Sequence, residues 1–211
     1  MRINSARGLL REFGIVFPAA AARLPDHVQG LIGDADAPVP MLFRDLLHPL
    51  VVEIQDLESR VKIVEKHLEA LASQTPVVEL LRTIPGVGLL TATALVGFVG
   101  DVARFPSGRH FACYLGLTPR EHSSAGRRTL GRISKRGDVY LRMLLIHGAR
   151  AVLWGAKSKS DPDRFRRWAL EVQRHRGHNK AAVAVANKLA RSVWAVWKFR
   201  RPLESRPAGT A

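Results

Sequence analysis

The sequence predicts a mainly α-helical protein in which one long amphipathic helix precedes a compact basic helical domain. Apolar residues recur with helical spacing in several segments, and no run of strand length alternates strictly between polar and apolar residues. The composition, 46% hydrophobic and 24% charged, is that of a folded protein. The charge is unevenly divided, because residues 1–75 hold 8 Lys and Arg against 10 Asp and Glu, whereas residues 76–211 hold 25 against 8.

Residues 1–40 are predicted to form the remnant of a helix followed by a connector. The helix rests on Ile3, Leu9, Leu10 and Phe13, which have helical spacing, and it looks like the continuation of an element that has lost its beginning. The connector is predicted from six residues that favour loops, broken by short helical turns at most: Pro18, Pro25, Gly30, Gly33, Pro38 and Pro40.

Residues 41–75 are predicted to contain the long amphipathic helix. Its apolar residues alternate steps of four and three, as in the seam of a coiled coil: Leu50, Ile54, Leu57, Val61, Val64, Leu68 and Leu71. Three heptads are marginal for an autonomous coiled coil, so one helix packed on its own domain is an equal alternative. Pro49 suits the first turn of this helix, and Pro76 marks its end.

Residues 76–200 are predicted to fold into one helical domain, and residues 201–211 into a disordered tail. The charge-free run from Thr83 to Gly100 is long enough to be tested as a membrane span, but its prolines, glycines and threonines exclude that, and no membrane partner is expected. The single cysteine, Cys113, permits no internal disulfide and is expected to be a buried apolar residue of a cytoplasmic protein.

The segment from Ile84 to Gly88 is a turn between two predicted helices. Gly86 and Gly88 would allow a phosphate backbone to approach the start of the second helix, in the manner of a helix-hairpin-helix. A compact packing turn is an equally good interpretation. The sequence leaves both open.

The segment from Thr118 to Gly137 is predicted to be a flexible loop rich in glycine, serine and arginine. It offers two adjacent candidate nucleophiles, Ser123 and Ser124, and His122 as a phosphate contact or general base. Six cations able to position and neutralise a phosphate surround them: Arg120, Arg127, Arg128, Arg132, Lys135 and Arg136. The alternative is a solvated charged loop without a ligand.

The two long helices predicted after this loop are assigned mainly to the core. Arg142 and Arg150 lie eight residues apart and could extend the phosphate-binding strip along one helix face. For Trp194 and Trp197, packing is favoured over stacking on an unpaired base. The scattered carboxylates predict no metal site and no cofactor for this chain.

The order of these motifs resembles the transposase domain of the insertion-sequence family numbered one hundred and ten, and most of all its eleven-eleven branch. The matching blocks cover nearly the whole chain: Leu80 to Gly88, Phe105 to Gly108, Phe111 to Arg120, His122 to Ser124, Gly131 to Asp138, Leu141 and Arg142, His147 to Arg150, Asn179 and Lys180, and Asn187 to Arg191.

The resemblance implies a bacterial, nucleoid-associated serine recombinase guided by a structured bridge RNA and acting on DNA as a dimer or tetramer. The family's nucleophilic serine lies thirteen residues before the glycine that corresponds to Gly137, which points to Ser124, with Ser123 in reserve because Ala125 stands where the family has a glycine. The family also carries an N-terminal resolvase-like domain whose carboxylates hold magnesium. No part of this sequence matches that domain, so the chain is expected to be a truncated transposase.

A second hypothesis is a non-catalytic remnant that binds DNA or RNA through its basic segments and dimerises through the heptad helix. Both hypotheses predict binding that weakens steeply with salt. Only the first predicts a covalent protein–DNA adduct once a magnesium-binding domain is supplied.

Overall fold

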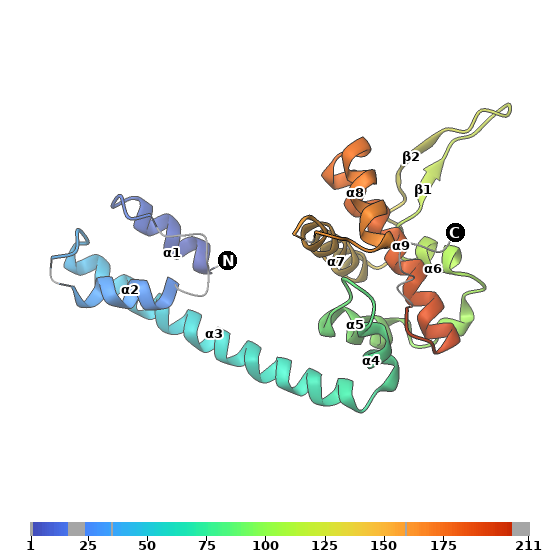
Figure 1. Ribbon diagram of the computed structural model, residues 1–211. Helices are drawn as coiled ribbons and strands as arrows, with labels where there is room; N and C mark the ends of the chain where they lie inside the picture. The colour runs from blue at the N-terminus through green and yellow to red at the C-terminus, as the bar shows by residue number, and fades with distance from the viewer. Residues whose placement is uncertain (1, 17–23, 35, 159, 204–211) are drawn as a thin grey trace. The chain divides into compact units, whose positions relative to one another are not determined.

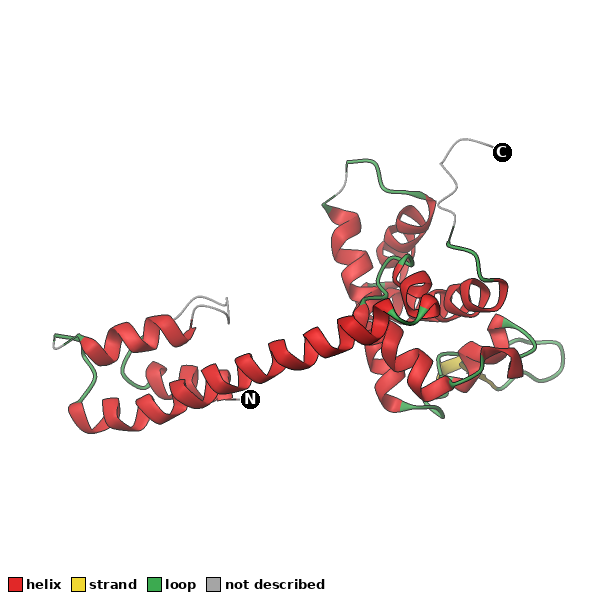
Figure 2. Ribbon diagram, turned by 90° about the horizontal axis from the view of Figure 1, so that it is seen from below, coloured by secondary structure: helices red, strands yellow, loops and turns green. Residues whose placement is uncertain are grey.

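The computed structural model describes residues 2–16, 24–34, 36–158 and 160–203, and the chain divides into two compact units at residues 67 and 68. Both units are mainly helical, which confirms the predicted fold class (Figures 1 and 2). Among the described residues, no helix is sufficiently long and apolar to cross a bilayer.

The first unit is a small helical core formed by α1 (Arg2–Arg11), α2 (Leu24–Gly33) and the start of α3 (Met41–Ser73). Leu10, Val28 and Leu47 are buried together in it. The connector prediction is therefore wrong for residues 24–33, which form a helix of three turns. A helix forms here because Pro25 falls in the first helical turn, where proline is tolerated, and because Leu24 and Val28 supply a buried face. Pro18 lies outside the described residues.

Helix α3 begins at Met41, so the prediction that Pro49 occupies its first turn is wrong. Pro49 lies inside the helix, where it removes one backbone hydrogen bond. Burial of Leu47, Val51 and Ile54 offsets that cost by removing three apolar side chains from water.

The heptad seam of α3 is buried at Ile54, and of its four leucine and valine positions from 57 to 68 only Leu68 is half-buried, while the others are exposed. Leu57, Val61 and Val64 are 43%, 55% and 56% exposed, and Leu71 is 60% exposed. These side chains are not packed on the chain's own domain, so of the two alternatives for this helix, packing on its own domain fails for this half. A coiled-coil partner stays a prediction.

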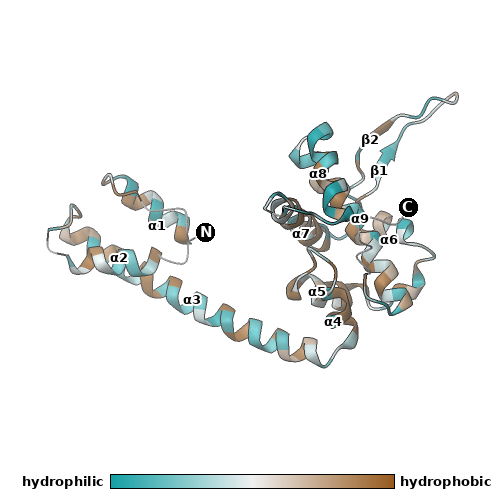
Figure 3. Ribbon diagram, viewed as in Figure 1, coloured by the Kyte–Doolittle hydropathy of each residue, from teal (hydrophilic) through white to brown (hydrophobic). Residues whose placement is uncertain are grey.

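The second unit surrounds α9 (His178–Phe199), which packs against α4 (Pro76–Arg82), α6 (Gly108–Tyr114), α7 (Val139–Lys157) and α8 (Arg164–Arg176). Small side chains on the buried face of α9, such as Ala182 and Ala186, let these helices approach closely. Helix α5 (Leu89–Val99) is mostly apolar and α8 mostly hydrophilic (Figure 3). A 3-10 turn, η2 (Val102–Arg104), joins α5 to α6. Within the described part of the predicted tail, residues 201–203 are non-helical, and the rest of that tail is outside the described residues.

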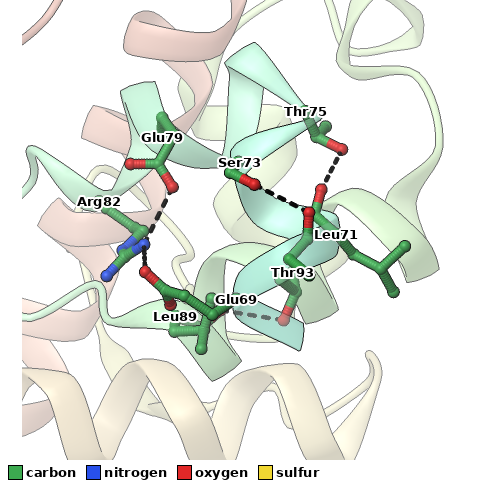
Figure 4. Close-up of polar contacts among 9 residues, drawn as sticks. Glu69, Leu71, Ser73, Thr75, Glu79, Arg82, Leu89 and Thr93 are labelled. Carbon is green, nitrogen blue, oxygen red and sulfur yellow. Dashed lines mark hydrogen bonds and ion pairs between the residues drawn. The ribbon is translucent and has the colours of Figure 1, made fainter. Parts of the chain in front are cut away.

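The end of α3 is fixed to α4 by one guanidinium. Arg82 forms ion pairs of 2.7 Å with Glu69 of α3 and 2.9 Å with Glu79 of its own helix (Figure 4). The hydrogen bond that Arg82 donates to Glu69, followed by the one it donates to Glu79, holds the pKa of Arg82 above its usual value. Because these side chains are partly exposed, the ion pairs contribute little to stability.

Candidate nucleic-acid interface

The segment predicted as a Gly/Ser/Arg-rich loop is a β-hairpin. Strand β1 (Pro119–Glu121) pairs antiparallel with β2 (Leu130–Ile133), and the pairing is irregular between its two ends. Backbone hydrogen bonds of 3.3 and 2.9 Å join Ser124 and Arg127 across the tip. Figure 1 shows the hairpin extending away from the helices of its own unit. The loop prediction was wrong here, because strands of three and four exposed residues are too short to show an alternating pattern.

The tip is a two-residue turn of the kind that matches strand twist. Its central residues, Ala125 and Gly126, both have positive φ, 47° and 77°. Two positive φ values in succession identify a type I′ turn, which normally favours Asn-Gly and which alanine enters with strain. Ser124 and Arg127 are therefore presented at the two corners of a defined turn.

The base of the hairpin is anchored by close backbone contacts. A Cβ atom at Gly137 would lie 2.1 Å from the carbonyl oxygen of Tyr114, so only glycine fits there. Lys135 N donates to Gly116 O at 3.1 Å, and Ser134 N donates to Thr118 O at 2.8 Å. The Ser-Lys-x-Gly block thus positions the hairpin on α6.

Arg142 belongs to this anchor, and its assignment to a phosphate-binding strip is corrected by its burial. It is 8% exposed, and its guanidinium donates to the carbonyl oxygens of Leu115, Gly137 and Asp138 at 3.2 to 3.4 Å. Only Arg150 of the predicted pair is exposed on α7. Helical spacing placed both on one side of α7, but it could not show that the chain before α7 covers Arg142.

Arg142→Ala is expected to lower the free energy of unfolding by about 2 to 4 kcal/mol, because three buried carbonyl groups lose a charged donor. Urea unfolding followed by circular dichroism measures this. The matched control, Arg150→Ala on the same helix, should stay within about 0.5 kcal/mol of the unsubstituted protein. Equal stability of the two variants would contradict the role assigned to Arg142.

The structure brings the remaining predicted cations together on or beside the hairpin, and all of them are exposed: Arg120, Arg127, Arg128, Arg132, Lys135 and Arg136. Glu121 is the one acid in the segment from residue 118 to 137, and it lies 3.4 Å from the Arg128 side chain. Arg120 donates to the carbonyl oxygen of Ser134 at 3.3 Å, across the pair of strands. These six residues, which we term the basic hairpin cluster, carry a large uncompensated positive charge that favours a polyanion.

The two candidate serines differ in their surroundings. The Ser123 hydroxyl donates to Glu121 Oε1 at 2.6 Å and accepts from Thr129 N at 3.2 Å. Ser124 is exposed at the tip, and within the described ranges its hydroxyl has no hydrogen-bond partner. Ser123 is therefore held in place, whereas Ser124 is accessible to a phosphate.

No role was predicted for Glu121 from the sequence. In the structure it is the carboxylate closest to a candidate nucleophile, because residues two apart in a strand face the same side. That spacing was visible in the sequence but depended on a strand that was not predicted. His122 is also exposed, and its backbone nitrogen pairs with Thr129 O at 2.9 Å.

The Gly86 turn packs against α7. Gly86 has a φ of +86°, and a Cβ there would lie 2.7 Å from Gly148 O. The packing interpretation is therefore favoured for Gly86. Gly88 differs, because it is exposed, begins α5 and has nothing within 4 Å of its missing Cβ. A phosphate contact at Gly88 stays a prediction.

The other expectations for this domain divide between confirmation and correction. Trp197 is buried at 5% exposure, which confirms packing for this residue, whereas Trp194 is half-buried and donates through Nε1 to Phe105 O at 3.0 Å. Cys113 is exposed, so the prediction that it is buried is wrong: the inner face of α6 is taken by its neighbours Phe111 and Ala112. The described residues hold no group of three or more His, Cys, Asp or Glu able to bind a metal ion.

Comparison with known proteins finds a family model and several relatives that are similar to this chain. Residues 78–165 match the model described as transposase, IS116/IS110/IS902 family. Over 194 residues, 92% of this chain, the sequence is 41% identical to a Pseudomonas aeruginosa protein described as "Probable family 20 transposase", of which 57% is covered. It is 37% identical to the transposase for insertion sequence element IS1111A of Coxiella burnetii, of which 53% is covered.

A third relative is the pilin gene-inverting protein of Moraxella lacunata, 31% identical over 129 residues, or 60% of this chain and 38% of that protein. The chain spans about half the length of the first two relatives. The match to the family model runs from α4 to the start of α8, and so includes the whole basic hairpin cluster.

Proposed function

From the match of residues 78–165 to the transposase model of the IS116/IS110/IS902 family, we propose that this chain belongs to that family and that it binds DNA and joins it during transposition or site-specific recombination. The observation that carries the proposal is the projecting hairpin, which presents the accessible Ser124 hydroxyl at its tip beside Arg127 and Arg128, with the other four exposed cations along its strands and at its base. Guanidinium groups bind phosphate oxygens with paired hydrogen bonds, and a hydroxyl beside them is placed to react with the phosphorus.

We propose Ser124 as the nucleophile. Its Oγ attacks the phosphorus of a DNA phosphodiester, so that an Oγ–P bond forms while one P–O bond to a deoxyribose oxygen breaks. The hydroxyl proton passes to a base or to solvent, and the departing deoxyribose oxygen takes up a proton. Arg127 and Arg128 neutralise the charge that builds on the phosphate oxygens. Ser123, bound to Glu121, is the reserve nucleophile.

We propose that the joining reaction also needs a magnesium-binding group that the described residues do not supply. The magnesium that the resemblance implies does not fit this chain, whose described residues offer no ligand cluster, so we propose that an acidic domain of a partner subunit supplies it. By the same proposal the protein acts in the bacterial cytoplasm, on the nucleoid, as a homo-oligomer with a structured guide RNA.

A second function, binding without catalysis, is favoured by one observation. The exposed apolar seam of α3, from Leu57 to Leu71, offers a dimer contact that requires no active site. Such a remnant would hold DNA through the basic hairpin cluster and form no covalent adduct. The two functions share the interface and differ in the chemical step.

The interface is tested by removing two hairpin charges. Arg127→Gln/Arg132→Gln is expected to weaken binding to a mixed-sequence DNA duplex about tenfold or more at low salt, because each cation releases counterions when it meets a phosphate. The plot of log affinity against log salt should become shallower by about two units. Fluorescence anisotropy over a series of NaCl concentrations measures both.

The matched control is Lys62→Gln/Lys66→Gln, which removes the same charge from the exposed face of α3 in the acidic half of the chain. Its affinity and salt slope should remain close to those of the unsubstituted protein. An equal loss in both double variants would show that net charge, and not the hairpin, attracts the DNA, and would overturn the assignment of this interface.

A further inference from the structure

A cavity of about 460 Å³ lies in the second unit, between the start of α6 and the C-terminal half of α9. The backbones of the two helices approach closely beside it: a Cβ at Gly108 would lie 3.2 Å from the Cα and carbonyl oxygen of Arg191. None of the residues that line it belongs to the hairpin. The cavity is therefore a feature separate from the basic hairpin cluster.

One wall of this cavity is apolar. It is formed by Trp194, Ala195 and Leu203, and the indole is fixed by its hydrogen bond to Phe105 O and by an edge contact with Phe199 at 5.7 Å between ring centroids. A rigid aromatic side chain beside small apolar groups is the usual surface on which a flat heterocycle stacks.

The lining of the cavity also contains three cations. Arg109, Lys188 and Arg191 line the cavity, and among the described residues none of the three forms an ion pair with a carboxylate. The Lys188 ammonium lies 4.0 Å from the centroid of the Trp168 ring. Partial burial, followed by the charges of Arg164 and Arg191, lowers the pKa of Lys188. The positive charges of these three side chains repel one another, and this repulsion costs free energy. An anionic ligand bound between them would remove that cost.

We propose that this cavity binds one unpaired nucleotide of a single-stranded nucleic acid, with the base against Trp194 and the phosphate on Arg109 and Arg191. The volume lies within the range of small-molecule sites. The hydroxyls of Ser107 and Ser192, also in the lining, add donors and acceptors for the base or sugar. A base paired in a duplex is covered by its neighbours and cannot enter, so the site selects single strands. The proposal goes beyond the joining function and holds whether or not Ser124 is a nucleophile.

Arg109→Gln/Arg191→Gln tests the site, because both arginines are exposed and their loss leaves the helix packing intact. Affinity for a short labelled oligothymidylate should fall about tenfold or more, while affinity for a duplex of equal length should change less than about twofold. A matched oligouridylate shows whether DNA or RNA is preferred, and a loss with either strand supports the site. Circular dichroism verifies that the variant is folded.

The control, Arg174→Gln/Arg176→Gln, removes the same charge from the exposed end of α8 and should leave single-strand affinity within about twofold. Photocrosslinking with an oligonucleotide carrying 5-iododeoxyuridine is expected to label the peptide that contains Trp194. Equal losses for single strands and duplexes, unchanged single-strand affinity, or a crosslink outside the cavity would overturn the proposal. The hairpin double variant Arg127→Gln/Arg132→Gln tests duplex binding, whereas the cavity variant tests single-strand binding. A negative result for one proposal is therefore distinguishable from a negative result for the other.

Discussion

Ser124→Ala is expected to remove the covalent protein–DNA adduct completely while leaving duplex affinity within about twofold of the unsubstituted protein. The substitution deletes the one oxygen that would bond to phosphorus. Within the described residues that hydroxyl has no hydrogen-bond partner, and the turn is held by the backbone atoms of Ser124 and Arg127. Fold and affinity should therefore survive the loss of chemistry.

The measurement uses labelled DNA, the full chain and a relative that supplies the acidic magnesium-binding domain. Adduct is counted as DNA that stays with the protein after denaturing electrophoresis and is released by protease. Adduct formed by the Ser124→Ala chain at the normal rate would rule out Ser124 as the nucleophile.

Ser123→Ala is the matched control, because it removes the neighbouring hydroxyl from the same hairpin. Its loss leaves the Glu121 carboxylate with Arg128 but without its hydroxyl donor, and leaves Thr129 N without its acceptor, so a slower reaction with adduct still present is expected. Adduct lost in Ser123→Ala and kept in Ser124→Ala would transfer the role to Ser123. Adduct absent from all chains, the unsubstituted one included, would favour the binding remnant.

The sequence was sufficient to predict the parts of this protein that depend on repeating patterns. The helical fold class follows from the spacing of apolar residues, and the cluster of cations follows from the density of Arg and Lys between residues 118 and 137. Gly137 was matched by position in a motif, and the structure adds the reason: its missing Cβ makes room for Tyr114 O. Features of this kind are set by residues close together in the sequence, so they can be predicted without knowing which distant segments are in contact.

What could not be predicted depends on contacts that leave no repeating pattern in the sequence. Arg142 has the same residue type and helix as Arg150, but a turn that packs over it converts a candidate ligand into an internal donor. The hairpin depends on the pairing of Glu121 with Leu130. Strands this short show no alternation of polar and apolar residues from which that pairing could be predicted. The pairing of Glu121 with Ser123 followed from that hairpin and was missed for the same reason.

The largest loss of stability is expected from Gly148→Ala in α7. A Cβ at this position would lie 2.0 Å from the carbonyl oxygen of Gly86. The two segments of the chain contact each other there through backbone atoms. Neither side can yield by rotating a side chain, so α7 or the turn before α5 must move. We expect the free energy of unfolding to fall by about 4 kcal/mol or more, at the upper end of single substitutions.

The control is Gly155→Ala on the same helix, where nothing lies within 4 Å of the added Cβ. Alanine is the better helix former by about 1 kcal/mol, so this variant should be as stable as the unsubstituted protein or more so. Both glycines are helical, which leaves the contact with Gly86 as the difference between them. Thermal unfolding should separate the two variants by about 10 °C or more. Equal midpoints would mean that the Gly86 turn does not pack on α7, and that this turn is free to meet a phosphate backbone.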